Sequence, residues 1–225
     1  MKVYQLADGG TNFSTREYDI AADAQVECGA VMRIVEGRAA AASQYQTTPV
    51  IGIAAESHSG EEDVFDPRAN GTKIRIWDSP NLIFQCAAPR VTATSGGSST
   101  LLAINGGDLG AFADDDFIGG YIRLAEKAQG STNTDRVGDI RRITDSSGTQ
   151  KTWTLEEGGT PCVGDVYEVY PPIGFMKGCL TDDRCGLRLV GTTNLALRVI
   201  GRDFDKGLIN MMPAKHILAN YFQNT

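Results

Sequence analysis

The amino-acid sequence predicts an all-β protein, with a barrel or sandwich base domain, an inserted small β-barrel-like module and little helix. Val, Ile and Thr, which are favoured in strands, are abundant along the whole chain. The 26 glycines and 8 prolines are spread rather than clustered, which leaves little room for long helices. Short apolar runs recur between turn signals roughly every ten residues. These features together favour a barrel or sandwich of short strands.

The first 90 residues carry five predicted strands. Between two of them, Glu36-Gly37 predicts a tight hairpin turn, because glycine takes a positive φ without steric cost. Residues 72–77 alternate, with two isoleucines on one face and Lys73 and Arg75 on the other, which is typical of a strand half exposed to water. The predicted strands are residues 30–35, 38–42, 50–55, 72–77 and 82–88.

The two ends of the chain allow more than one interpretation. Residues 1–24 carry aromatic side chains among polar ones without a clean period, which indicates either an extended arm that packs on a partner or an ordinary first strand. Near the C-terminus, strands at 195–200 and 208–212 flank a predicted hairpin turn at 203–207. Residues 214–222 are predicted to form either a short helix or a last strand.

The middle of the chain is predicted to be a separate module. Residues 92–100 have the Thr-, Ser- and Gly-rich composition of a linker, and Tyr170-Pro171-Pro172 stiffens the other end. We therefore divide the chain into a discontinuous β base domain with an N-terminal arm, residues 1–92 and 173–225, and an inserted β module, residues 93–172. A module of this size can fold independently.

Inside the module, turn signals separate short strand candidates. Residues 145–148, Asp-Ser-Ser-Gly, are predicted to be a hairpin turn. Trp77 and Trp153 are expected in the two cores, one in each, as large apolar side chains on strands. The predicted strands are residues 101–104, 118–125, 138–144, 152–155 and 165–170.

Composition argues against several classes of partner. The chain has 21 Lys and Arg against 28 Asp and Glu, a net charge of −7, and a pI near 4.9. Nucleic-acid affinity comes mostly from clustered Lys and Arg, so no nucleic-acid partner is predicted. No apolar run approaches the roughly 18 residues of a membrane helix, so no membrane partner is predicted. No secretory signal is visible at the start, and we expect synthesis in a cytoplasm.

No catalytic, cofactor or metal site is predicted. The only histidines are His58 and His216, too few for a zinc site of several imidazoles. The run at 114–116, Asp-Asp-Asp, lacks the spaced ligands of a calcium loop and is interpreted as a solvated acidic turn. Five cysteines in a chain without a secretion signal indicate mostly reduced, buried thiols. Cys179 and Cys185 form either two free thiols or a labile disulfide.

Longer patterns resemble a known family. Residues 26–40, VECGAVMRIVEGRAA, followed by 49–54, PVIGIA, resemble the opening barrel of head decoration (cement) proteins of tailed bacteriophages. Residues 117–123, 138–144 and 163–169 resemble a small β module common in phage virion proteins. The similarity covers roughly two thirds of the chain. It consists of strand and turn patterns, and the family pattern has no catalytic residues to carry over.

The resemblance implies a virion structural protein that binds the exterior of an assembled capsid and stabilises it. Its partners would be the major capsid protein and further copies of itself, as a homotrimer, and it would be made in the host cytoplasm and located on the capsid exterior. An acidic chain suits an outer capsid face better than a DNA-lined interior. The candidate capsid or subunit contacts lie in the N-terminal arm. They are Tyr4, Phe13, Arg16 and Tyr18.

The boundary signals, the Ser/Thr/Gly-rich entry at 92–100 and the Pro-Pro exit at 171–172, also lead us to expect different roles for the two parts of the chain. The base domain is expected to dock and trimerise, and the inserted module to project outward and to be dispensable for capsid binding. Two other functions stay open. One is a phage fibre or adhesin domain that binds host surface glycans. The other is an enzyme acting on the cell envelope, for which Asp115 and Asp116 would be the residues to test.

Overall fold

The computed structural model describes residues 2–6, 14–42, 48–59, 72–95, 98, 100–105, 112–176, 178–180, 187–189 and 196–217. Within these ranges the chain forms antiparallel sheets and contains no helix, which confirms the predicted all-β class. Accordingly, this part of the protein contains no helix that is long and apolar enough to cross a membrane.

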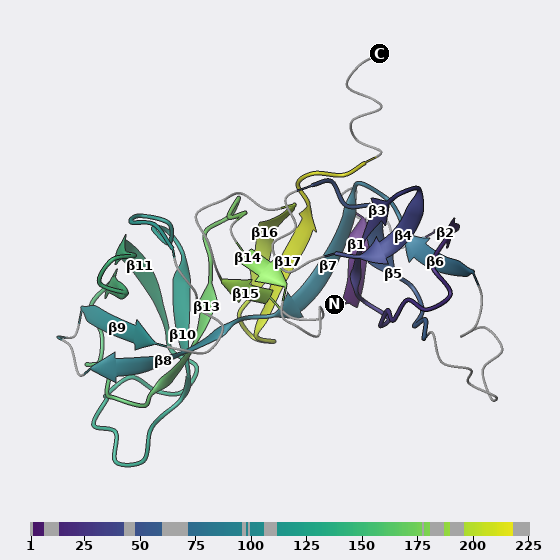
Figure 1. Cartoon of the computed structure of the whole chain (residues 1–225). Coiled ribbons are helices and arrows are strands. Elements are labelled where there is room, and N and C mark those ends of the chain that lie inside the picture. The colour runs from purple at the N-terminus through teal and green to yellow at the C-terminus, as the bar shows by residue number, and fades with distance from the viewer. Residues whose placement is uncertain are drawn as a thin grey trace.

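Three β bodies follow one another along the molecule, with the barrel at one end and a five-stranded sheet at the other (Figure 1). The closed barrel has the order β10-β11-β12-β9-β8-β13. Its strands are β8 (Arg90–Ser95), β9 (Leu101–Asn105), β10 (Tyr121–Glu126), β11 (Ile140–Ser147), β12 (Thr152–Leu155) and β13 (Val166–Tyr170).

A four-stranded sheet lies between the barrel and the five-stranded sheet (Figure 1). Its order is β1-β7-β17-β16, so strands from both ends of the sequence meet in one sheet. The strands are β1 (Lys2–Leu6), β7 (Leu82–Ala87), β16 (Leu197–Asp203) and β17 (Leu208–Pro213), and a separate pair is formed by β14 (Gly178–Leu180) and β15 (Leu187–Leu189).

The five-stranded sheet has the order β2-β6-β5-β3-β4. Its two outer strands also touch, through a parallel bridge between Ile20 and Ala39, so the sheet curls toward closure. The predicted hairpin is confirmed, since Glu36 and Gly37 have φ values of 50° and 81° at the turn. The strands are β2 (Thr15–Asp19), β3 (Val31–Val35), β4 (Arg38–Ala41), β5 (Gly52–Ala54) and β6 (Lys73–Trp77).

Burial follows the strand alternation. Ile74 and Ile76 on β6 are buried, and Lys73 and Arg75, which alternate with them, are exposed, as predicted. Every barrel strand likewise contributes buried apolar side chains to a common interior. The interior residues include Val91, Ala93, Leu102, Ile104, Ile122, Leu124, Ile143, Trp153, Leu155, Tyr167 and Val169.

The main core is shared among the barrel, the four-stranded sheet and part of the five-stranded sheet, to which Val31 and Ile53 belong. One cluster of buried residues runs from Trp153 in the barrel to Phe84 and Met211 in the sheet, and Trp77 packs against the same cluster. The prediction of one tryptophan in each of two cores is therefore wrong. A second, smaller cluster fills the five-stranded sheet. A continuous core crosses the boundary between the predicted base domain and the predicted module. The division of the chain into these two domains stays a prediction.

Three local predictions are also wrong. The presumed linker at 92–100 begins as strand β8, because Val91 and Ala93 are buried while Thr92 and Thr94 face solvent. The presumed turn at 145–148 is largely strand, because Ser146 packs inward and the chain turns at 148–151 instead. Residues 118–120 belong to a turn that precedes β10 rather than to the strand.

The predicted hairpin near the C-terminus is confirmed, with β16 and β17 joined at 204–207. The described residues after it, 214–217, form no helix and no regular strand, although His216 bridges to Val50. The rest of the segment predicted as a helix or strand, residues 218–222, lies outside the described residues.

Candidate subunit-contact site at strand β2

Strand β2 (Thr15–Asp19) carries two of the candidate contact residues, Arg16 and Tyr18. It pairs with β6 along one edge, with Arg16 opposite Ile76 and Tyr18 opposite Ile74. Residues that face each other across an antiparallel pair lie on the same side of the sheet. Because both isoleucines are buried, Arg16 and Tyr18 lie on the inner side of β2.

Both side chains converge on Asp78, which follows β6 directly. The Tyr18 hydroxyl donates to Asp78 Oδ2 at 2.6 Å, and Arg16 Nε lies 3.3 Å from the same oxygen. The Asp78 side chain is only 5% exposed, whereas that of Arg16 is 66% exposed. A buried carboxylate is stable only when it is paired and hydrogen-bonded, so these two partners hold Asp78 inside and hold β2 against β6.

The pKa of Tyr18 is raised well above its ordinary value. Burial of the ring is the largest cause, followed by the hydrogen bond to Asp78 and the negative charge of that carboxylate. Tyr18 therefore stays a neutral hydrogen-bond donor at any physiological pH. Arg16 Nε faces the same oxygen, so a positive charge sits beside the donor while much of the arginine stays in water.

The outer side of β2 and β6 is strongly charged. Lys73 Nζ lies 2.8 Å from Asp19 Oδ1 across the strand pair, and Arg75 pairs with Glu56 at 2.7 Å. The hydrogen bond from Lys73, followed by its positive charge, lowers the pKa of Asp19. Exposed ion pairs of this kind contribute little to stability but exclude nonspecific strand pairing, because charged side chains on an edge disfavour aggregation.

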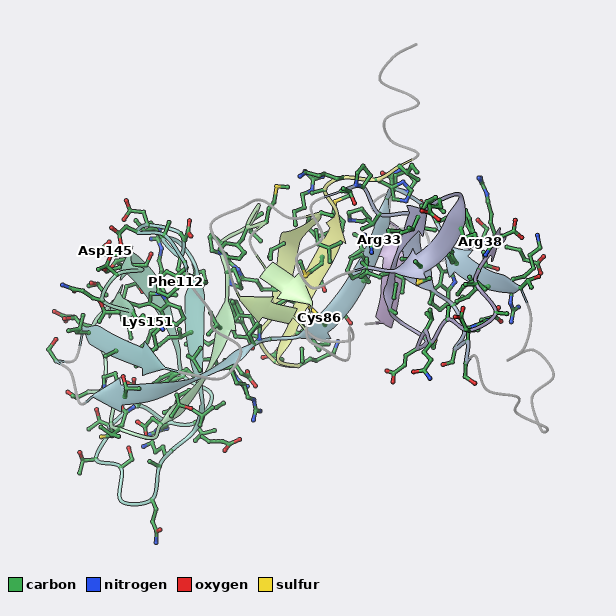
Figure 2. The ribbon with its side chains drawn as sticks, in the orientation of Figure 1. Arg33, Arg38, Cys86, Phe112, Asp145 and Lys151 are labelled. Carbon is green, nitrogen blue, oxygen red and sulfur yellow. The ribbon has the colours of Figure 1, made fainter. Side chains whose placement is uncertain are left out.

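Two neighbouring depressions lie beside this edge and share Arg38. One, of about 430 Å³, is lined by Asp19, Ile20, Ala22, Arg38 and Thr72. The other, of about 450 Å³, lies along β4 and is bordered mostly by alanines. Arg38 and Arg33 belong to this end of the molecule, far from Asp145 and Lys151 on the barrel (Figure 2). The walls of the two depressions combine small apolar side chains with the shared Arg38 and with one acidic residue each, Asp19 and Glu36.

The four predicted contact residues do not form one described patch. Arg16 and Tyr18 are brought together, as given above. Tyr4 belongs to β1, in the four-stranded sheet, where only the backbone is described, and Phe13 lies outside the described residues. Contact with a second chain through these residues stays a prediction. Sequence reasoning missed Asp78, because an Asp in a turn after a strand usually faces water.

The acidic run at 114–116 serves the local backbone. Asp114 Oδ1 accepts a hydrogen bond from the Gly148 amide at 2.9 Å, and Asp116 Oδ2 accepts one from the Ala113 amide at 2.7 Å. Asp115 has a φ of 65° at the turn. Across the described ranges, no group of three or more His, Cys, Asp or Glu side chains is arranged to hold a metal ion.

Both histidines are buried and contact backbone carbonyls. His58 Nδ1 lies 2.7 Å from the Ala24 oxygen, and His216 Nε2 lies 3.0 Å from the Ile51 oxygen. Burial is the main reason that the pKa of His216 is lowered. The thiols of Cys28, Cys86 and Cys162 are free. The open question about Cys179 and Cys185 lies outside the described residues, since only the backbone of Cys179 is described.

A buried polar network closes the end of the barrel that faces away from the sheet. The Asp165 carboxylate accepts hydrogen bonds from the Ala128 and Cys162 amides and from Asn133 Nδ2, at 2.9, 3.1 and 2.9 Å. Asn133 Nδ2 also donates to the Tyr167 hydroxyl. Burial tends to raise the pKa of Asp165, but these hydrogen bonds outweigh burial, and the net pKa is lowered.

Arg141 extends this network. Its guanidinium donates to the backbone oxygens of Glu156 and Gly159. The loops at 127–139 and 156–165 are thereby fixed to the barrel wall.

No protein-family model, curated protein or solved structure matches the chain.

Proposed function

We propose that the protein is a virion structural protein that binds the exterior of an assembled tailed-phage capsid and stabilises it. The observation that carries the proposal is the two-ended, all-β architecture, with a curled five-stranded sheet and its charged edge at one end and a closed barrel at the other (Figure 1). A molecule of this form can dock through one end and project the other. The resemblance of residues 26–40 to decoration proteins points in the same direction.

The mechanism is mass action. A ligand that binds the assembled lattice but not its separated subunits stabilises the lattice in proportion to the logarithm of its concentration over its dissociation constant. The net charge of −7 suits a contact on the outer face of a capsid, because DNA inside would repel an acidic chain.

We assign docking to the end that carries β2. Arg16 keeps most of its side chain in water although its Nε lies beside Asp78, so its outer nitrogens are available to a partner carboxylate. The opposite, outer face of the same strand pair carries Asp19 and Lys73, which form an exposed ion pair with each other. The barrel end would then point away from the capsid.

The test is co-sedimentation of purified protein with bare capsids assembled from the major capsid protein of the phage that carries this gene, followed by imaging of the lattice. We expect saturable binding, a regular decoration of the lattice, and capsids that resist higher temperatures. Protein that stays in the supernatant at micromolar concentration contradicts the proposal, and a specific hit on a glycan array favours the adhesin function instead.

A matched pair of variants tests which end docks. Arg16→Ala removes an exposed cation at β2, and Arg136→Ala removes an exposed cation from the loops at the far end of the barrel. We expect the first to weaken capsid binding several-fold and the second to leave it unchanged. If only Arg136→Ala weakens binding, the barrel is the docking end.

A further inference from the structure

The β16–β17 hairpin reaches beyond the four-stranded sheet and lies against the outside of the barrel. Its turn, residues 204–207, places Phe204 beside two barrel tyrosines. The Phe204 ring lies 4.7 Å from the Tyr170 ring and 5.6 Å from the Tyr121 ring, both edge-to-face. Such aromatic pairs stabilise beyond the area that they bury, and they fix the relative orientation of the elements that carry them.

Arg202 on β16 adds polar contacts to the same barrel strands. Its guanidinium lies 4.9 Å from the centre of the Tyr121 ring. Its Nε donates to the Pro171 oxygen at 2.9 Å, and one terminal nitrogen donates to the Gly119 oxygen at 3.2 Å. One side chain thus connects the sheet to the chain entering β10 and to the chain leaving β13.

The end of the hairpin turn covers a nearly buried carboxylate on the barrel. Glu168 on β13, with 9% of its side chain exposed, lies 2.9 Å from Arg123 and accepts a hydrogen bond from the Tyr170 hydroxyl. A side-chain carbon at Gly207 would lie 3.2 Å from Glu168 Oε1, so the turn rests directly on that group. The Gly207 oxygen also accepts a hydrogen bond from the Ala88 amide.

The chain leaving the barrel is tied to the same sheet. The Gly174 amide donates to the Val199 oxygen at 2.8 Å, and the Val199 amide donates to the Phe175 oxygen at 2.9 Å, so residues 174–175 pair with the outer edge of β16. The Phe175 ring in turn lies 5.2 Å from Phe117 at the base of the barrel. Both connections between barrel and sheet are therefore fixed by contacts across the boundary.

We propose that the β16–β17 hairpin is a rigid strut that locks the barrel to the four-stranded sheet, so that the two move and unfold as one body. This goes beyond the proposed function, because it holds whatever the molecule binds. Inserted modules joined by short segments commonly move relative to their host domain unless the interface is large and apolar. Here the hairpin supplies that interface and the core continues through it.

The test compares unfolding of the two bodies in urea. Trp153 lies in the barrel, and Trp77, at the end of β6, packs against the cluster that contains Phe84 and Met211 of the four-stranded sheet. The variants Trp77→Phe and Trp153→Phe therefore each keep one fluorescent probe, the first in the barrel and the second beside the sheet. We expect coincident transitions in the otherwise unchanged chain. With Phe204→Ala and Arg202→Ala added, we expect the transitions to separate and the barrel midpoint to fall by about 1 M urea.

Two controls isolate the strut. Arg198→Ala removes an exposed arginine from the same strand away from the barrel and should leave the transitions coincident. Phe204→Leu keeps apolar bulk, so replacing Phe204 by Leu instead of Ala should recover most of the lost barrel midpoint. Transitions that are already separate in the parent chain, or that stay coincident at an unchanged midpoint in the double variant, overturn the proposal.

A second measurement needs no tryptophan substitution. Amide ¹⁵N relaxation should give the barrel and the four-stranded sheet one common rotational correlation time, and two different times in the Phe204→Ala, Arg202→Ala variant. Two correlation times in the unaltered protein contradict the strut.

Discussion

At the scale of single residues, the Asp78 carboxylate determines how strand β2 is held. Tyr18→Phe removes the hydroxyl that donates to Asp78. The buried Asp78 carboxylate then keeps its contact with the exposed Arg16 but loses this hydrogen bond. We expect the free energy of unfolding to fall by about 1.5 kcal/mol, measured by urea denaturation.

Tyr121→Phe is the matched control for this change. It removes a tyrosine hydroxyl but keeps the ring contact with Phe204, and we expect a change within about 0.5 kcal/mol. Equal losses in both variants would show that the bond to Asp78 is not the cause.

His216 makes stability depend on pH. Because burial lowers its pKa below the ordinary 6.5, the unfolded chain binds a proton more readily than the folded one. The contribution is fully present above pH 6.5 and is lost as the pH falls toward the folded pKa. We expect the free energy of unfolding to decline as the pH falls below 6.5, by at most about 1.4 kcal/mol per pH unit.

His216→Gln, which keeps a donor for the Ile51 oxygen, should flatten this decline. Urea denaturation at a series of pH values measures the slope in both proteins. Asp165 does not affect this comparison. Because its pKa is lowered, its contribution to the free energy of unfolding is lost only as the pH falls below the ordinary carboxyl pKa of 3.8. The same slope in both proteins would assign the pH dependence to other groups.

Single residues show where prediction from the sequence ends. The faces of Ile74 and Lys73 follow from strand alternation, which is a local property, and both were predicted correctly. The partners of Asp78 come from a strand 60 residues away, and nothing in the composition around Asp78 indicates them. Arg16 and Tyr18 were selected from the sequence, but their shared partner required the pairing of β2 with β6.

At the scale of elements, Gly52 allows β5 to lie against the end of β6. Its φ is +148°, and a side-chain carbon there would lie 1.9 Å from the Trp77 backbone oxygen. We expect Gly52→Ala to cost more than about 3 kcal/mol, since backbone must move. Gly37→Ala, with a φ of +81° and open space around it, should cost only about 1 kcal/mol.

Thermal unfolding of both glycine variants measures the difference. Similar thermal midpoints for the two variants would mean that β5 can move away from β6 without loss of stability. The close approach of the two backbones at Gly52 would then not be needed.

The loops at the far end of the barrel depend on Asp165. Asp165→Asn replaces a carboxylate oxygen by an amide nitrogen among three donors, so at least one buried donor loses its partner. We expect a loss of about 3 kcal/mol in urea denaturation.

Asp139→Asn is the control for Asp165. It alters an exposed acceptor of a single amide, that of Arg136, and should cost at most about 1 kcal/mol. If the control is as costly as Asp165→Asn, the effect is that of any turn acceptor and not of the buried network.

Elements were predicted well where the signal is local. The hairpin at Glu36-Gly37 follows from one glycine between two alternating runs. The sequence at 92–95, Thr-Ala-Thr-Ser, is equally compatible with a linker and with a strand, and pairing with β9 and β13 decides for the strand. The turn after β11 was misplaced for the same reason, because Asp145 and Ser146 suit either a turn or a strand.

At the scale of the whole molecule, the proposed function includes self-association. We expect light scattering after size exclusion to give about three times the chain mass of 24.1 kDa, because the resemblance of residues 26–40 to decoration proteins implies a homotrimer. A mass of one chain, both in solution and when bound to capsids, would remove the trimer from the proposal.

The overall arrangement of the bodies was the least predictable feature. Glycine and proline signals divide the chain near residues 92 and 172, but they carry no information on what crosses that division. The contacts of Phe204 with Tyr121 and Tyr170 join segments more than 30 residues apart, and only the folded chain brings them together. We therefore expect removal of the module to destabilise the base, although its strands pair among themselves.

The short connection between β7 and β8 gives the molecule a direct route for mechanical load. Only Ala88 and Pro89 separate the two strands, and β7 lies between β1 and β17 in its sheet. A pull on the barrel therefore travels along the axis of β7 and shears two ladders of hydrogen bonds at once, instead of opening one ladder bond by bond. Such an anchor resists tension along its length far better than peeling from the side.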